Sequence, residues 1–200
     1  MKQVYLDNAA TTPMSPTVID VITDEMANDF GNASSTHTLG RKARNSVETA
    51  RHTIAQAINA KDQEIIFTSG GSESNNTVIF GVAEMQKAVG RHLITTKIEH
   101  ESVLKSMQRL EELGYEVTYL DVDRDGHISL DQLREAIRPD TILVSVMAVN
   151  NEVGSINPLK DIGQIVKDSQ AFFHVDAVQG LGNIDLDVEE MGIDFMSTSA

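Results

Sequence analysis

Residues 92–121, HLITTKIEHESVLKSMQRLEELGYEVTYLD, decide the fold class of this chain. Two short apolar runs, 92–96 and 116–121, flank a segment at 100–114 whose apolar residues recur at helical spacing. The pattern predicts a strand, a helix and a second strand. Because a helical crossover joins parallel neighbours, this unit predicts a parallel sheet.

The same alternation extends in both directions along the chain. It predicts helices at residues 16–30, 39–60, 74–89, 129–137 and 159–169, and further strands at 64–68, 141–147, 171–177 and 194–198. The strand runs are continuously apolar, which is typical of strands covered on both faces. We therefore expect an α/β fold of three layers, α/β/α, with a mainly parallel sheet.

Composition excludes several classes of function. The chain has 200 residues, a formal net charge of −14 and no cysteine. The charge argues against direct nucleic-acid binding, and the lack of cysteine excludes disulfides and thiolate metal sites. The N-terminus lacks the pattern of a signal peptide, and no apolar run is long enough to span a membrane. These features predict a cytoplasmic protein without membrane contact.

Polar loops follow the predicted strands. They are 69–76 (SGGSESNN), 97–102 (KIEHES), 148–154 (AVNNEVG), 176–180 (DAVQG) and 197–200 (STSA). In parallel sheets, ligands bind beyond the carboxyl ends of the strands. The loops therefore predict one shared binding edge.

Two of these loops suggest specific chemistry. Gly70 and Gly71 allow a tight turn, and Ser72 is expected to cap the next helix, whose N-terminus favours a phosphate. Taken alone, this loop is better explained as an ordinary glycine turn with a serine N-cap. Asp176 ends an apolar strand, where a carboxylate suits either neighbouring backbone N–H groups or the protonated nitrogen of a pyridine ring. Gln179 could then reach a ring hydroxyl.

The other loops carry one imidazole and two amides. His100 lies at a strand-to-helix junction, where it is either structural or able to stack on a flat cofactor and move protons. Asn150 and Asn151 either complete a turn or contact a ligand. A phosphate site, a carboxylate for a ring nitrogen, a stacking imidazole and amides together meet the requirements of pyridoxal 5'-phosphate.

Five motifs resemble those of a known family. They are YLDNAATTP (5–13), FTSGGSESNN (67–76), TKIEHESV (96–103), VNNEVGSI (149–156) and HVDAVQG (174–180). They resemble the NifS/IscS-type cysteine desulfurases of the class V aminotransferases. The resemblance implies fold-type I and a homodimer. It also implies that residues 1–15 belong with a small domain and residues 16–200 form part of a large cofactor-binding domain.

The resemblance implies roles for particular residues. Gly71, Ser72 and Ser199 would bind the phosphate of pyridoxal phosphate. His100 would stack on the ring and act as acid and base, and Asp176 would pair with the ring nitrogen. Asn151 and Gln179 would contact the ring hydroxyl side. Three residues would lie near the substrate entrance: Asn8, Ala9 and Thr11.

The implied reaction converts L-cysteine to L-alanine and transfers sulfur to an enzyme persulfide. A sulfur-acceptor protein, either a scaffold for iron–sulfur clusters or an enzyme of tRNA thiolation, would receive it. In the family, a histidine and the Schiff-base lysine follow the position of Ala200, and the persulfide cysteine lies farther on. We therefore expect these 200 residues alone to be inactive. The alternatives are another class V enzyme, such as a selenocysteine lyase or an aminotransferase relative, and a non-catalytic truncated product.

One motif resembles a calcium loop. Residues 121–132, DVDRDGHISLDQ, place aspartates at the first, third and fifth positions and glycine at the sixth. The twelfth position is Gln132 where a bidentate glutamate is required, and a strand precedes the loop where an EF-hand has a helix. We expect a polar turn capped by Ser129, and no metal site.

Overall fold

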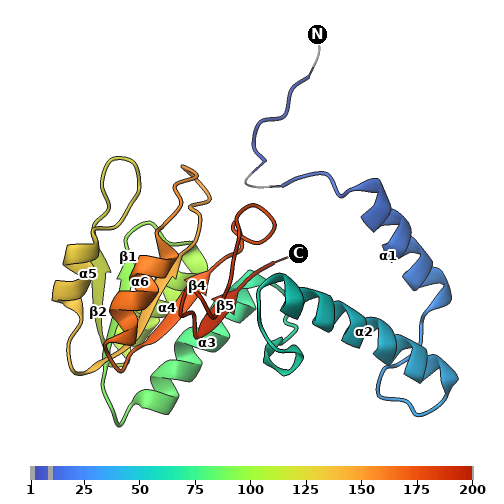
Figure 1. Ribbon diagram of the computed structural model, residues 1–200, viewed down its shortest axis with the longest axis horizontal. Helices are drawn as coiled ribbons and strands as arrows, with labels where there is room; N and C mark the ends of the chain where they lie inside the picture. Colours follow the sequence, from blue (N-terminus) through green and yellow to red (C-terminus); the bar gives the residue numbers. More distant parts are fainter. Residues whose placement is uncertain (1–2, 9–10, 200) are drawn as a thin grey trace. The chain divides into compact units, whose positions relative to one another are not determined.

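The computed structural model describes residues 3–8 and 11–199. They form two compact units, Met1–Ile66 and Phe67–Ala200 (Figure 1). Within the described residues, no helix has both the length and the apolar character needed to cross a membrane. The assignment of residues 1–15 to a small domain stays a prediction.

The first unit contains two helices, α1 (Pro16–Asn28) and α2 (Thr38–Ala57), as the sequence predicts. Ser15 caps α1 by accepting a hydrogen bond from the Val18 amide, and Pro16 occupies a first-turn position. None of the α1 residues is buried. This unit therefore has little core of its own.

The second unit is built on a five-stranded sheet with the order β2-β1-β3-β4-β5. All four neighbouring pairs are parallel. The strands are β1 (His92–Thr96), β2 (Glu116–Leu120), β3 (Thr141–Met147), β4 (Phe172–Asp176) and β5 (Phe195–Ser197). The predicted parallel sheet is confirmed.

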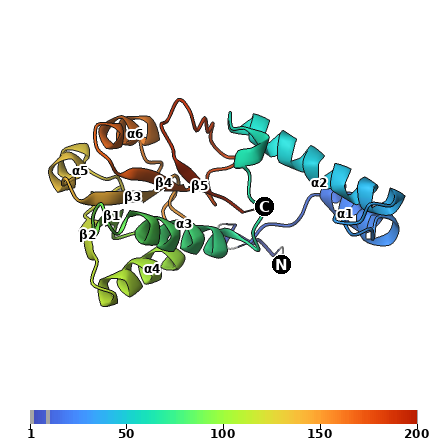
Figure 2. The ribbon, with the colours of Figure 1, turned by 90° about the horizontal axis from the view of Figure 1, so that it is seen from below.

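Helices cover both faces of the sheet (Figure 2). One face carries α3 (Gly71–Gln86) and α4 (Glu101–Glu112), and the other carries α5 (Leu130–Ala136) and α6 (Leu159–Lys167). Adjacent residues of β1 serve the two faces, because Leu93 packs in the α3–α4 core and Ile94 in the α5–α6 core. The three-layer architecture is confirmed.

One predicted strand is wrong. Residues 64–68 do not form a strand, and the first of them ends a short 3₁₀ helix, η1 (Asp62–Glu64). Ile66 is 79% exposed, although the apolar run suggested burial. A strand needs a hydrogen-bonded neighbouring strand, and this segment is not part of the five-stranded sheet.

The loop that resembles a calcium site forms a polar turn. One carboxylate oxygen of Asp123 accepts hydrogen bonds from the backbone amides of Asp125 and His127, both at 2.9 Å. Asp121 pairs with Lys97 at 2.6 Å. Ser129 caps α5 through the Gln132 amide, as predicted. The carboxylates of Asp123 and Asp121, which a calcium ion would need as ligands, are therefore already bonded to backbone amides and to Lys97.

A buried glutamate joins the ends of β1 and β3. The Oε1 atom of Glu99 accepts hydrogen bonds from the Thr96 hydroxyl at 2.8 Å and the Met147 amide at 3.0 Å. Its Oε2 atom is buried without a partner among the described residues. Burial raises the pKa of the Glu99 carboxyl to about 8, so the group is protonated at neutral pH.

Helix α6 lies so close to the backbone of Met191 that only glycine fits at position 163. A Cβ atom on Gly163 would lie 1.8 Å from the Met191 carbonyl oxygen. We expect Gly163→Ala to lower the free energy of unfolding by about 1–3 kcal/mol, measured by urea denaturation. The matched control is Gly81→Ala on α3, where a Cβ meets nothing within 4 Å. That substitution should raise stability by about 0.5–1 kcal/mol. Equal effects at both positions would contradict the close packing.

Glu99 also predicts a pH dependence of stability. The folded protein keeps the Glu99 proton up to about pH 8, whereas in the unfolded chain the carboxyl loses it near its ordinary pKa of 4.5. Folding therefore takes up a proton between these values, and this group lowers stability by about 1.4 kcal/mol per pH unit as pH rises. The Glu99→Gln variant lacks this contribution. Its stability relative to the natural protein should increase from pH 5 to pH 8 in urea titrations; a constant difference would refute the assignment.

Candidate active site

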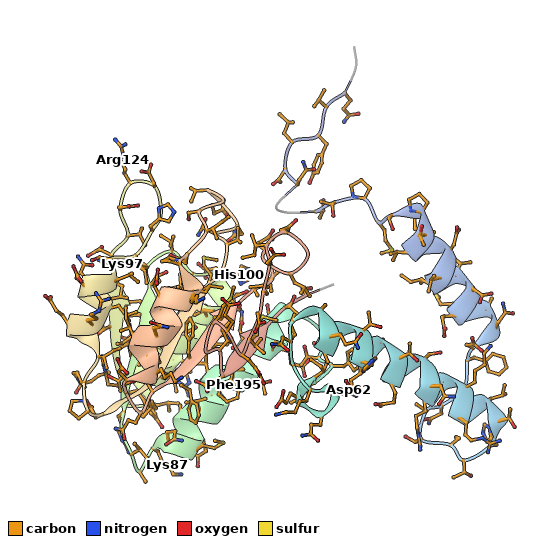
Figure 3. The ribbon with its side chains drawn as sticks, viewed as in Figure 1. Asp62, Lys87, Lys97, His100, Arg124 and Phe195 are labelled. Carbon is orange, nitrogen blue, oxygen red and sulfur yellow. The ribbon has the colours of Figure 1, made fainter. Side chains whose placement is uncertain are left out.

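The candidate site lies at the carboxyl ends of the strands. Strand order reverses at β1, which has β2 on one side and β3 on the other. Such a switch point opens a crevice between the loops that leave the two strands. His100 and Lys97 follow β1 at this edge (Figure 3).

The loop before α3 is the predicted phosphate turn. Gly70 has φ +152°, a backbone conformation that side chains disfavour, and α3 begins at Gly71. A Cβ atom at Gly71 would lie 2.6 Å from a methyl carbon of Val178, so the turn packs tightly on the loop after β4. Ser72 lies in the first turn and Gly70 holds the cap position, which corrects the expectation that Ser72 caps α3. The first-turn N–H groups lack partners within the helix and point outward.

Asp176 ends β4 and is 4% exposed. Its Oδ2 atom accepts a hydrogen bond from the Asn75 side chain at 2.7 Å, and its Oδ1 atom accepts one from the Val178 amide at 3.1 Å. Both donors are neutral, and within the described residues no cationic side chain pairs with this carboxylate. A buried carboxylate in this state favours a cationic ligand.

A hydrogen-bonded chain joins Asp176 to His100. The Asn75 amide donates to Asp176 and also to the Ser102 hydroxyl, at 2.9 Å. The Ser102 hydroxyl lies 2.8 Å from Nδ1 of His100, and the Ser102 backbone amide donates to the same nitrogen at 3.1 Å. Nδ1 is thus an acceptor. In the neutral imidazole the proton therefore lies on Nε2, the nitrogen available to a ligand.

His100 has a structural role in α4. It is the N-cap residue of α4, and its ring accepts the amide of the first helical turn. The ring is exposed, as a group that stacks on a ligand must be. The structural and functional interpretations of His100 are therefore compatible.

The two amides after β3 have different positions. Asn150 is buried, donates to the Ile98 carbonyl at 2.9 Å and accepts two backbone amides of its own turn. It completes the turn. Asn151 is half-buried, and its side chain donates to Glu152 at 2.8 Å. The fold thus places the predicted ligand residue, Asn151, beside a structural one.

The remaining predicted residues fall in both units. Gln179 is half-buried in the loop after β4, and Ser199 is exposed beyond β5, at the same sheet edge. Asn8 and Thr11 are exposed residues of the first unit, and the Thr11 hydroxyl lies 2.9 Å from that of Tyr5. Ala9 lies outside the described residues. The roles of all these residues stay predictions.

Sequence reasoning missed the supporting residues. Asn75 and Ser102 connect the predicted groups, and Glu99 joins the strands beneath them. Asn75 and Ser102 lie within the SGGSESNN and KIEHES loops, each in the first turn of a predicted helix. Their position on the inner side of the first turn is the signal that could have identified them.

Comparison with known proteins places this arrangement in a family. The aminotransferase class-V model matches residues 4–200. The chain is 49% identical to the putative cysteine desulfurase IscS 1 of Bacillus subtilis, covering 100% of this chain and 52% of the relative. It is 50% identical to the mitochondrial cysteine desulfurase of Candida maltosa, covering 41% of that protein. The chain thus spans about half the length of the curated relatives it matches, or less.

Solved structures agree with the sequence relatives. SspA in complex with cysteine superposes with a TM-score of 0.94 at 42% identity, covering 98% of this chain and 56% of that one. A NifS-like protein gives 0.95 at 39% identity, with 99% and 55% covered. The chain therefore belongs to the class V aminotransferases, in the group whose members are IscS- and NifS-type cysteine desulfurases.

Proposed function

We propose that the protein carrying this chain is a pyridoxal-phosphate-dependent cysteine desulfurase. The observation that supports this most directly is the buried Asp176 carboxylate. It has neutral donors and no cation among the described residues, and hydrogen bonds link it to the exposed His100 ring. A protonated ring nitrogen is a suitable partner for such a carboxylate.

The residues present fit pyridoxal phosphate. The glycine turn at the start of α3 offers backbone donors for a phosphate, and the contact of Gly71 with Val178 leaves no room for a side chain. Asp176 offers the negative charge for a pyridinium. When bound, the cofactor supplies an electron-withdrawing ring that stabilises negative charge on the substrate.

Each residue then has a task. Asp176 holds the ring nitrogen in its protonated form, and Asn75 keeps the carboxylate oriented. His100 would lie against the ring and would move protons through Nε2, because Ser102 occupies Nδ1. Asn151 and Gln179 contact the hydroxyl side of the ring, and Ser72 and Ser199 contact the phosphate. Asn8, Ala9 and Thr11 contribute to the substrate entrance.

The proposed substrate is L-cysteine. This proposal is supported by the names of the relatives and by the structure of SspA in complex with cysteine. The bond between Cβ and sulfur breaks, Cβ takes a proton to give L-alanine, and sulfur passes to a cysteine thiol as a persulfide. These 200 residues contain no cysteine, so the thiol lies outside them. A sulfur-acceptor protein and a second copy of the chain are the proposed partners, in the cytoplasm.

Loss of the Asp176 charge tests the cofactor assignment. In the protein expressed from its complete reading frame, Asp176→Asn should slow alanine formation from L-cysteine by roughly ten- to a thousandfold. The reason is that an adjacent opposite charge changes the pKa of a group, here the ring nitrogen, by about 1–3 units. The absorption spectrum of the bound cofactor should shift as well. The control is Asp131→Asn, an exposed carboxylate on α5 that should change neither. An unchanged rate and spectrum in Asp176→Asn would refute the proposed pairing.

Two substitutions of His100 separate its capping role from its chemical role. Asparagine caps helices well, so His100→Asn should keep the stability of α4, whereas His100→Ala should lose about 1 kcal/mol in urea denaturation. Both remove the imidazole and should lower the rate of alanine formation by about 10²–10⁴-fold. If His100→Asn kept the full rate, His100 would be a cap only.

A further inference from the structure

A second hydrogen-bonded chain crosses the sheet beneath the phosphate turn. His174, on β4, is fully buried, and its Nδ1 atom lies 2.8 Å from the hydroxyl of Ser145 on β3. Its Nε2 atom lies 3.0 Å from the hydroxyl of Ser197 on β5. The hydroxyl of Ser74, on α3, donates to Ser197 at 2.8 Å. Four side chains thus connect three neighbouring strands to one helix.

The hydrogen bonds from Ser74 to Ser145 all run in one donor-to-acceptor direction. Burial lowers the pKa of the His174 imidazole to about 3, so the ring is neutral and carries a single N–H. Ser74 donates to Ser197, so the Ser197 hydroxyl hydrogen is available to Nε2 of His174. Nδ1–H then donates to Ser145. Every ring nitrogen of the buried imidazole has a partner, as a buried polar group requires.

The hydrogen-bonded chain of side chains ends on the first turn of α3. Ser74 follows Ser72 by two residues, and its backbone amide donates to the Gly70 carbonyl at 3.1 Å, which closes the turn. The first-turn N–H groups depend for their direction on how this turn is rotated against the sheet. The next residue, Asn75, bonds to Asp176, so consecutive side chains of α3 contact β5 and β4.

A second buried histidine in the same sheet has a purely structural role. His92, at the start of β1, is also buried, and its two nitrogens bond to the hydroxyls of Thr141 and Thr118. That imidazole joins β1, β2 and β3, and both of these partners lie on strands. His174 differs because its chain leaves the sheet and ends at the phosphate turn.

We propose that His174 is a positioning residue for the cofactor phosphate, acting through Ser197 and Ser74 on the first turn of α3. The inference rests on the proposed function, because it assumes that this turn binds the phosphate of pyridoxal phosphate. His174 itself contacts neither the cofactor nor the substrate. Its effect should therefore appear in the affinity for the phosphate group and not in affinity for the ring.

Two variants of His174 each break the hydrogen-bonded chain on one side of the imidazole. The side-chain amide of glutamine reaches the position of Nε2, so His174→Gln keeps the bond to Ser197 and loses the one to Ser145. Asparagine is shorter and reaches the position of Nδ1, so His174→Asn keeps Ser145 and loses Ser197. Both leave one broken hydrogen bond in the core and are matched in polarity.

The measurement is the ratio of dissociation constants for pyridoxal and pyridoxal 5'-phosphate, by spectroscopic titration of the protein from its complete reading frame, freed of cofactor. We expect His174→Asn to lower the preference for the phosphorylated form by roughly tenfold or more, and His174→Gln to retain it. Ser74→Ala should reproduce the loss. His92→Asn should lower the melting temperature and leave the ratio unchanged.

The outcomes separate the two proposals. If the natural protein binds neither compound, or binds both equally, the proposed function fails. If it prefers the phosphorylated form and His174→Asn and Ser74→Ala keep that preference, the function stands and the role of His174 is refuted. If His174→Asn does not fold, Ser74→Ala decides alone, because Ser74 lies at the partly exposed end of the chain.

Discussion

A buried carboxylate without a cationic partner among the described residues is the constraint on which the site depends. Asp176 lies at the end of an apolar strand, where an unpaired negative charge is unfavourable. Two neutral donors, the Asn75 amide and the Val178 backbone, keep it oriented and leave it able to accept a cation. The proposed ligand, with its protonated ring nitrogen, would supply the missing cation.

The first turns of α3 connect the parts of the site. Two consecutive residues point into the sheet: Ser74 reaches Ser197 on β5, and Asn75 reaches Asp176 on β4. Through Ser102, Asn75 also orients the imidazole at the start of α4. The same short segment begins with the glycine turn proposed to bind phosphate. The start of α3 therefore connects the proposed phosphate turn to Asp176 and His100.

The sheet beneath the site is fastened by polar side chains at its switch point. Protonated Glu99 joins the loop after β1 to the end of β3, and Asn150 bonds to the carbonyl of Ile98 in the same loop. These contacts hold together the loops that carry His100 and Asn151. They belong to neighbouring strands far apart in the sequence, so the spacing of residues does not reveal them.

The sequence by itself determined the three-layer parallel fold, because helical and strand periodicities alternate along most of the chain. It also singled out Asp176 and His100 as candidate site residues because each lies at or just after the end of a strand, and the glycine turn because it precedes a helix. It misplaced a strand at residues 64–68, because an apolar run does not reveal whether a neighbouring strand exists. Only the tertiary structure decided how the loops are connected. Asn75, Ser102, Glu99 and His174 act through partners on other elements, and such contacts form only when the chain folds.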